Sequence, residues 1–127
     1  LLSGGVDSSL VAQVAKKINP DIDAYTCAFK SDDLDLQRSE LLCHQLKIKQ
    51  KVYFHEKDYL ELAIQVIEEP LGDSIVSPLM GLLELSSTGS KVVLSGEGAD
   101  ELFGGYLYFQ GHICSFPHHS QIGGIGS

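Results

Sequence analysis

The sequence predicts an α/β fold in which helices cover both faces of a doubly wound parallel sheet. Three observations predict it: short apolar strands alternate with helical segments, several of those strands are almost continuously apolar, and a glycine-rich motif directly follows two of them. Near-continuous apolar strands are typical of parallel sheets that are buried on both faces. We therefore expect three layers, helix, sheet and helix.

The first strand and helix open the sequence. An apolar strand ends at Leu2, and the periodicity predicts a helix over residues 8–17. Residues 22–29 alternate partly and form the second strand, which completes a βαβ unit. The sequence starts inside the first strand, so we interpret it as part of a longer protein. The apolar residues expected on the packing face of the helix are Leu10, Val11, Val14 and Ala15.

The same alternation continues along the chain. A second helix is expected to end near Lys47 and to be capped by Asp33 or Asp35, because Asp side chains accept hydrogen bonds from the first N–H groups of a helix. We expect the four strands to lie in the order 3-2-1-4. The remaining elements predicted are a strand at 51–54, helices at 58–67 and 79–85, and a strand at 91–94.

The composition argues against several classes of partner and site. A formal net charge of -8 repels a phosphate backbone, so nucleic acid is not expected to bind. No apolar run is long enough to cross a bilayer. The 3 cysteines have no CxxC spacing, which fits neither a disulfide framework nor a closed zinc site. A reducing cytoplasm is the expected location.

The first glycine-rich motif follows the first strand and reads Ser3-Gly4-Gly5-Val6-Asp7-Ser8-Ser9. Open α/β sheets bind ligands at the carboxyl ends of their strands. Adjacent glycines let backbone N–H groups approach an anion, and the helix that follows directs its positive dipole end at the same point. The motif therefore predicts a phosphate site, although a glycine turn with Asp7 or Ser8 as a simple helix cap is the alternative.

Asp7 and the absence of a motif lysine refine this phosphate site. A carboxylate repels phosphate unless a divalent cation lies between them, so we predict Mg²⁺ beside Asp7. A Walker A loop carries a lysine that reaches the terminal phosphates, and this motif has none. The motif resembles the PP-loop of ATP pyrophosphatases, which cleave ATP between its α and β phosphates. The resemblance implies an adenine-nucleotide α-hydrolase-like fold, incomplete in this chain.

The second motif, residues 95–106, follows the strand predicted at 91–94 and reads SGEGADELFGGY. Its carboxylates Glu97, Asp100 and Glu101 would repel one another unless a cation relieves them, although a solvated acidic helix start is the alternative. This segment resembles the hallmark of glutamine-dependent asparagine synthases. The stretch from Glu69 to Ser74 resembles the same family, so the resemblance covers the chain to about Phe109.

The resemblance implies roles for individual residues. Leu2, Cys27, Ser95 and Gly96 would flank the adenine and ribose of ATP through backbone contacts. Asp7 and Asp100 would bind Mg²⁺, and Glu97 would stand beside the reacting β-carboxylate of aspartate, either to orient it or to manage an ammonia proton. The residues implied to hold pyrophosphate are Ser3, Gly4, Gly5, Asp7, Ser8 and Ser9.

The reaction implied is adenylation of aspartate, followed by displacement of AMP by ammonia. The ammonia would come from a glutaminase domain, which this chain lacks, as it lacks the family's later lysine; the isolated chain is therefore not expected to be active. The full-length protein is a possible homodimer. A β-lactam synthetase-like ligase acting on another carboxylate and a non-catalytic nucleotide-binding remnant are the alternatives. We assign residues 1–109 to the synthetase domain and residues 110–127 to an irregular tail.

Overall fold

The computed structural model describes residues 1–67 and 72–107. These residues divide into two compact units, one spanning Leu1–Gly96 and one beginning at Glu97. The tail predicted over residues 110–127 lies outside the described part of the chain. Within the described ranges, no helix is long and apolar enough to cross a membrane.

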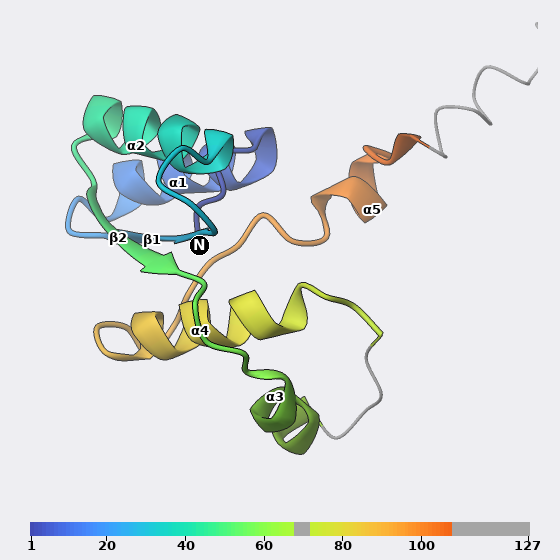
Figure 1. Ribbon diagram of the computed structural model, residues 1–127. Helices are drawn as coiled ribbons and strands as arrows, with labels where there is room; N and C mark the ends of the chain where they lie inside the picture. Colours follow the sequence, from blue (N-terminus) through green and yellow to red (C-terminus); the bar gives the residue numbers. More distant parts are fainter. Residues whose placement is uncertain (68–71, 108–127) are drawn as a thin grey trace, which may run out of the picture. The chain divides into compact units, whose positions relative to one another are not determined.

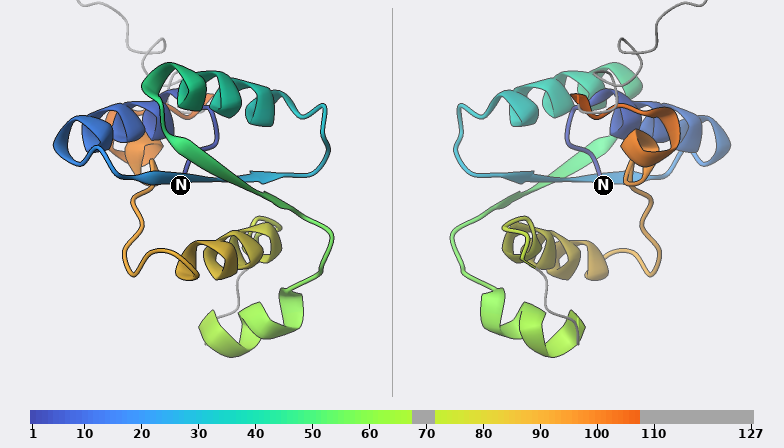
Figure 2. Two further views of the ribbon diagram at one scale, coloured as in Figure 1. Left: turned by 90° about the vertical axis from the view of Figure 1, so that its left-hand side faces the viewer. Right: turned by 90° about the vertical axis from the view of Figure 1, so that its right-hand side faces the viewer.

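The first unit is an incomplete α/β fold with the predicted three layers. Helices α1 and α2 lie on one side of the two strands, and α4 lies on the other side with α3 packed against it (Figures 1 and 2). The strands and helices alternate as the periodicity predicts. The elements are α1 (Val6–Ile18), β1 (Asp23–Ala28), α2 (Leu34–Leu46), β2 (Lys49–Phe54), α3 (Leu60–Ile67) and α4 (Val76–Ser87).

Strands β1 and β2 are parallel, with Asp23 opposite Lys49 and Ala28 opposite Phe54. On the other edge of β1, the Leu2 N–H donates to the Tyr25 carbonyl over 2.9 Å, as the next strand of a parallel sheet would. The segments predicted as strands 3, 2 and 1, which are β2, β1 and the residues ending at Leu2, therefore lie in the predicted order.

The strand predicted over residues 91–94 is not formed, so that prediction is wrong for the described structure. The segment is positioned beside Leu1, whose terminal ammonium donates to the Leu94 carbonyl. A ladder needs several paired residues on each strand. Beyond this contact, the described residues form no regular ladder with the segment.

The packing face predicted for α1 is also partly wrong. Leu10 and Val14 are 60% and 48% exposed. Val11 and Ala15 are half-buried as predicted, and Ser8 and Ala12 join them on the inward face in place of Leu10 and Val14. Small side chains let the helix approach the sheet closely, and this orientation turns the larger Leu10 and Val14 toward solvent.

Helix α2 is capped as the sequence predicts. The Asp33 side chain accepts a hydrogen bond from the Asp35 N–H over 3.1 Å, so Asp33 is the N-cap. The helix then packs Cys43 against Leu2, Ala24 and Ile48, which together form a buried apolar cluster. This cluster fixes the end of the first strand, and with it the start of the first glycine motif.

Candidate functional site

The first glycine motif forms a tight turn between Leu2 and α1, and Gly4 is its most constrained residue. Gly4 has a φ of +79°, a region that L side chains rarely adopt. A Cβ at this position would lie 2.8 Å from the Arg38 Cβ and 2.9 Å from the Asp35 carbonyl oxygen. Glycine is thus required here, because the turn packs directly on the first half of α2.

The hydroxyl groups of the motif hold the turn together. The Ser3 and Ser8 Oγ atoms are 3.0 Å apart, and the Ser3 N–H donates to the Ser8 Oγ over 3.3 Å. Ser8 is buried, whereas Ser3 and Gly5 are exposed. The buried serine therefore shapes the turn, and the exposed residues are open to a ligand.

Helix α1 begins at this turn without a side-chain cap. Its N-cap is Gly5, no side chain accepts a capping hydrogen bond, and Asp7 lies inside the first turn. The Ser9 N–H donates to the Gly5 carbonyl over 3.1 Å and so belongs to the helix. The alternative in which Asp7 or Ser8 merely caps the helix is not observed. A helix start of this kind attracts an anion through its N–H groups and its dipole.

The beginning of the second motif lies against this helix start. A Cβ at Gly96 would stand 2.6 Å from the Ser8 nitrogen and 3.1 Å from the Asp7 Cβ. Only glycine fits so close to the backbone of α1. The structure thus brings Gly96, and with it the end of the 91–96 segment, to the first motif as the sequence predicts.

Leu2 and Cys27 lie at adjacent strand ends, where the sequence places them. The Leu2 N–H donates to the Tyr25 carbonyl, and the Leu2 carbonyl accepts from the Thr26 Oγ1 over 2.9 Å, so both backbone groups of this buried residue are hydrogen-bonded. Burial, and secondarily the charge of Asp33, raises the pKa of the Cys27 thiol, so Cys27 stays neutral at physiological pH.

Glu97 and Asp100 belong to the second unit, whose helix α5 spans Ala99–Phe103. A Cβ at Gly105 would overlap the Asp100 Oδ1, so the GGY turn folds back against that carboxylate. The Tyr106 hydroxyl donates to Glu101 and lowers the pKa of that carboxyl. Asp100 and Glu101 are thus contacted by Gly105 and Tyr106 at the end of the motif.

The predicted metal ligands, Asp7 and Asp100, fall in different units. Among residues 1–67 and 72–107, no group of three or more His, Cys, Asp or Glu side chains could by itself hold a metal ion. The tail residues His112, Cys114, His118 and His119 lie outside the described ranges.

The asparagine synthase family model matches residues 1–122 of the chain. The chain belongs to this family. Glutamine-hydrolyzing asparagine synthetase 1 of Bacillus subtilis is 34% identical over 129 residues, covering 98% of this chain and 20% of that protein. Glutamine-hydrolyzing asparagine synthetase 1 of Arabidopsis thaliana is 35% identical over 126 residues, covering 86% of this chain and 21% of that protein. The chain therefore spans about a fifth of the length of these relatives.

A solved structure confirms the fold of this asparagine synthase family member. The NH3-dependent NAD synthetase of Campylobacter jejuni superposes with a TM-score of 0.55 at 23% identity, covering 83% of this chain and 48% of that one. At this identity the likeness concerns the fold alone. It supports the predicted incomplete α/β fold.

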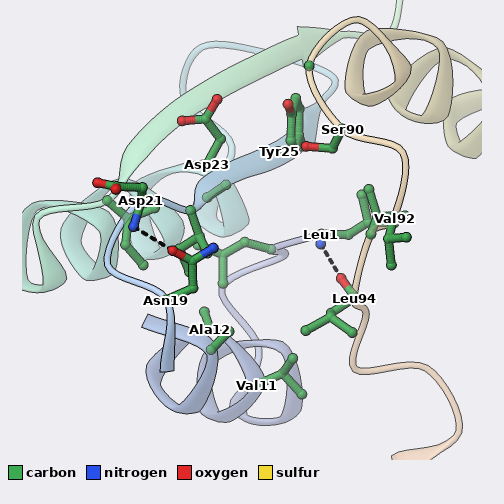
Figure 3. A pocket seen from close by; sticks show the side chains of 17 residues that line it. Leu1, Val11, Ala12, Asn19, Asp21, Asp23, Tyr25, Ser90, Val92 and Leu94 are labelled. Carbon is green, nitrogen blue, oxygen red and sulfur yellow. Dashed lines mark hydrogen bonds between the residues drawn. The ribbon is translucent and has the colours of Figure 1, made fainter. Parts of the chain in front are cut away.

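A cavity of about 270 Å³ lies away from the glycine motif, at the amino-terminal ends of the strands. Figure 3 shows Asn19, Asp23 and Tyr25 among the residues that line it, and the hydrogen bond from the Leu1 nitrogen to the Leu94 carbonyl. Among the residues predicted to bind nucleotide only Leu2 lines the cavity, so the cavity is not the predicted nucleotide site.

Three polar residues that were not among the predicted site residues lie beneath the motif and support it. The Gln50 Nε2 donates to the Thr26 Oγ1 over 2.8 Å and to the Ser39 Oγ over 2.9 Å. Thr26 and Ser39 are completely buried. One signal in the sequence could have indicated them: Thr26 lies inside a strand predicted to be buried. Buried polar side chains normally have hydrogen-bond partners, so a partner for Thr26 was to be expected.

Proposed function

We propose that this chain supplies the ATP-binding part of an asparagine-synthase-type ligase. In the full-length protein, an aspartate β-carboxylate oxygen would attack the α-phosphorus of ATP and pyrophosphate would leave. Ammonia from a glutaminase domain would then displace AMP to give asparagine. The observation that carries the proposal is the exposed glycine turn at the uncapped start of α1, against which Gly96 packs.

The turn suits pyrophosphate for three physical reasons. The first N–H groups of a helix have no partner within the helix and point along its axis toward an anion. The Gly5 residue is exposed and carries no side chain to keep a phosphate away. The Ser3 hydroxyl is exposed beside it and offers a further donor, and Ser9 supplies a hydroxyl one turn into the helix. Such preorganised donors stabilise charge on a departing group.

Magnesium fits the donors near this turn. Mg²⁺ is usually held by one or two carboxylates together with substrate phosphates and water, and Asp7 supplies one carboxylate within the first turn of α1. We include Asp100 as the second carboxylate on the strength of the family resemblance. When bound, the ion would offset negative charge on the phosphates.

Glu97 is the residue we propose beside the aspartate β-carboxylate. It is exposed and immediately follows Gly96, whose backbone lies against α1. A carboxylate here could orient the α-ammonium group of aspartate or accept a proton from ammonia during attack. The Glu97→Gln variant separates the roles, because glutamine retains hydrogen bonding but cannot act as a base.

The test is pyrophosphate release by the full-length protein with Mg-ATP. We expect release that depends on aspartate and produces AMP and asparagine when ammonia is added. Release with another carboxylate but not with aspartate would indicate a β-lactam synthetase-like ligase instead. Tight Mg-ATP binding without pyrophosphate release with any carboxylate would indicate a nucleotide-binding protein without this chemistry.

A further inference from the structure

A chain of hydrogen bonds runs beneath the glycine turn and joins β1, β2 and α2. The Thr26 Oγ1 donates to the Leu2 carbonyl over 2.9 Å, and the Ser39 Oγ donates to the Leu36 carbonyl over 2.8 Å. The Gln50 Nε2 lies between these hydroxyls and donates to both. We call Thr26, Ser39 and Gln50 the support triad.

The hydrogen-bond donors and acceptors of the support triad allow only one orientation of the Gln50 side-chain amide. Carbonyl oxygens cannot donate, so the Thr26 and Ser39 hydroxyl protons must point to Leu2 and Leu36. Each hydroxyl can then only accept from the side chain between them. The amide nitrogen of Gln50 has two protons, one for each hydroxyl, and its oxygen could serve neither. Every polar group in the buried part of the triad is therefore satisfied.

The two ends of the support triad reach two points of the same turn. The Leu2 carbonyl belongs to the peptide bond that enters the turn at Ser3. At the other end, a Cβ on Gly4 would stand 3.0 Å from the Ser39 backbone nitrogen, so Gly4 is seated against the residue that carries the second hydroxyl. Gln50 thus ties the entry of the turn to the surface on which the turn rests.

We propose that Gln50 and Thr26 are positioning residues for the phosphate loop, which is the glycine turn of residues 3–9. This inference rests on the function proposed above. The two side chains do not reach the exposed face of the loop. They fix the direction of the Leu2–Ser3 peptide, and hence of the N–H groups that follow it. A small misplacement of donors weakens binding of the charged group at which they aim.

The Gln50→Glu variant is the sharpest test, since it keeps the size of the side chain and exchanges a double donor for an acceptor. The Thr26 and Ser39 hydroxyls would have to turn toward the new carboxylate and release Leu2 and Leu36. In the full-length protein we expect the KM for ATP to rise about tenfold while the KM for aspartate changes less than about twofold. Gln45→Glu, an exposed position on α2, is the charge-matched control and should change neither value.

Thr26 provides a second, independent variant. Thr26→Ser keeps the hydroxyl and should retain the KM for ATP, whereas Thr26→Val has the same shape without the donor and should raise it as Gln50→Glu does. If Gln50→Glu fails to fold, the comparison of Thr26→Ser with Thr26→Val still decides. An unchanged KM for ATP in the folded variants, with only lowered thermal stability, would overturn the proposal.

Hydrogen exchange separates this inference from the proposed function. Amide exchange across residues 2–9 of the full-length protein should be at least about tenfold faster in Gln50→Glu, with α3 and α4 unchanged. A wild-type protein that releases no pyrophosphate would defeat the proposed function yet leave this result standing. Equal exchange in wild type and variant would show that Gln50 does not hold the loop.

Discussion

Two neighbouring glycines in the phosphate loop are glycine for different physical reasons. Gly4 has a positive φ and packs on α2, so Gly4→Ala should cost about 2–4 kcal/mol of stability. Gly5 has φ −73° and ψ 167°, which any residue adopts, and its Cβ would meet only the Ser3 Oγ at 3.4 Å. We expect Gly5→Ala to fold normally but to bind Mg-ATP about tenfold more weakly, because its methyl group would face the phosphates.

Thermal unfolding and calorimetric titration with Mg-ATP, on the full-length protein, measure these two effects. Gly72→Ala is the matched control, since nothing lies within 4 Å of a Cβ there. It should change neither stability nor affinity. If Gly5→Ala bound Mg-ATP as tightly as the wild type, the turn would not be a phosphate cradle.

At the level of residues, the sequence allows a site residue to be predicted when its spacing within a motif indicates its role. Gly4, Gly5 and Gly96 are recognisable because adjacent or motif-bound glycines imply close backbone approach, and the structure shows such approach at Gly4 and Gly96. Gln50 carries no such signal. Its role depends on Thr26 and Ser39, which are 24 and 11 residues away along the chain, and only the packing of two strands and a helix brings the three together.

At the level of elements, helix α4 contains a glycine where alanine would normally be about 1 kcal/mol more favourable. A Cβ at Gly81 would lie 2.2 Å from the Tyr53 Cζ and 2.4 Å from its Cε1, so the tyrosine ring rests directly on the helix backbone. We expect Gly81→Ala to destabilise the protein by about 1–3 kcal/mol despite its helix propensity. Urea unfolding of the wild type and the variant measures the difference.

The matching experiment removes the ring. In a Tyr53→Leu background, Gly81→Ala should become neutral or stabilise by up to about 1 kcal/mol, and the double-mutant cycle gives the coupling between β2 and α4. A stabilising effect of Gly81→Ala with Tyr53 present would refute the close packing of the ring.

The elements and the order of the first three strands were largely predictable, but the fourth strand and part of the α1 packing face were not. Periodicity located α1, α2 and both strands within a few residues, since each has its own apolar pattern. It placed Val11 and Ala15 of α1 correctly but not Leu10 and Val14, because the small residues Ser8 and Ala12 pack inward in their place. It also predicted a strand at 91–94, where apolar composition alone cannot supply a hydrogen-bonding neighbour.

At the level of the whole molecule, two of the side-chain pairs in the described ranges give testable pH dependences of stability. The Lys51 ammonium, 2.8 Å from Asp23, lowers the pKa of that carboxyl. The stability from this pair is present above the ordinary Asp pKa of about 4 and is lost as pH falls through the lowered value. Lys51→Met should therefore make the acid side of the stability curve shallower.

The alkaline side depends on Tyr59, a buried residue whose hydroxyl donates to Glu84 and joins α4 to the residue that precedes α3. That hydrogen bond, and then burial, raises the pKa of Tyr59 to about 12. Because the folded state holds the proton more tightly, its contribution is complete below the ordinary tyrosine pKa of about 10 and is lost as pH rises toward 12. In Tyr59→Phe the free energy of unfolding should fall less steeply between pH 10 and about 12 than in the wild type. A tyrosinate absorbance titration should likewise lose one late-titrating group in that variant, and identical curves for the two proteins would show that the Tyr59 to Glu84 bond is not formed.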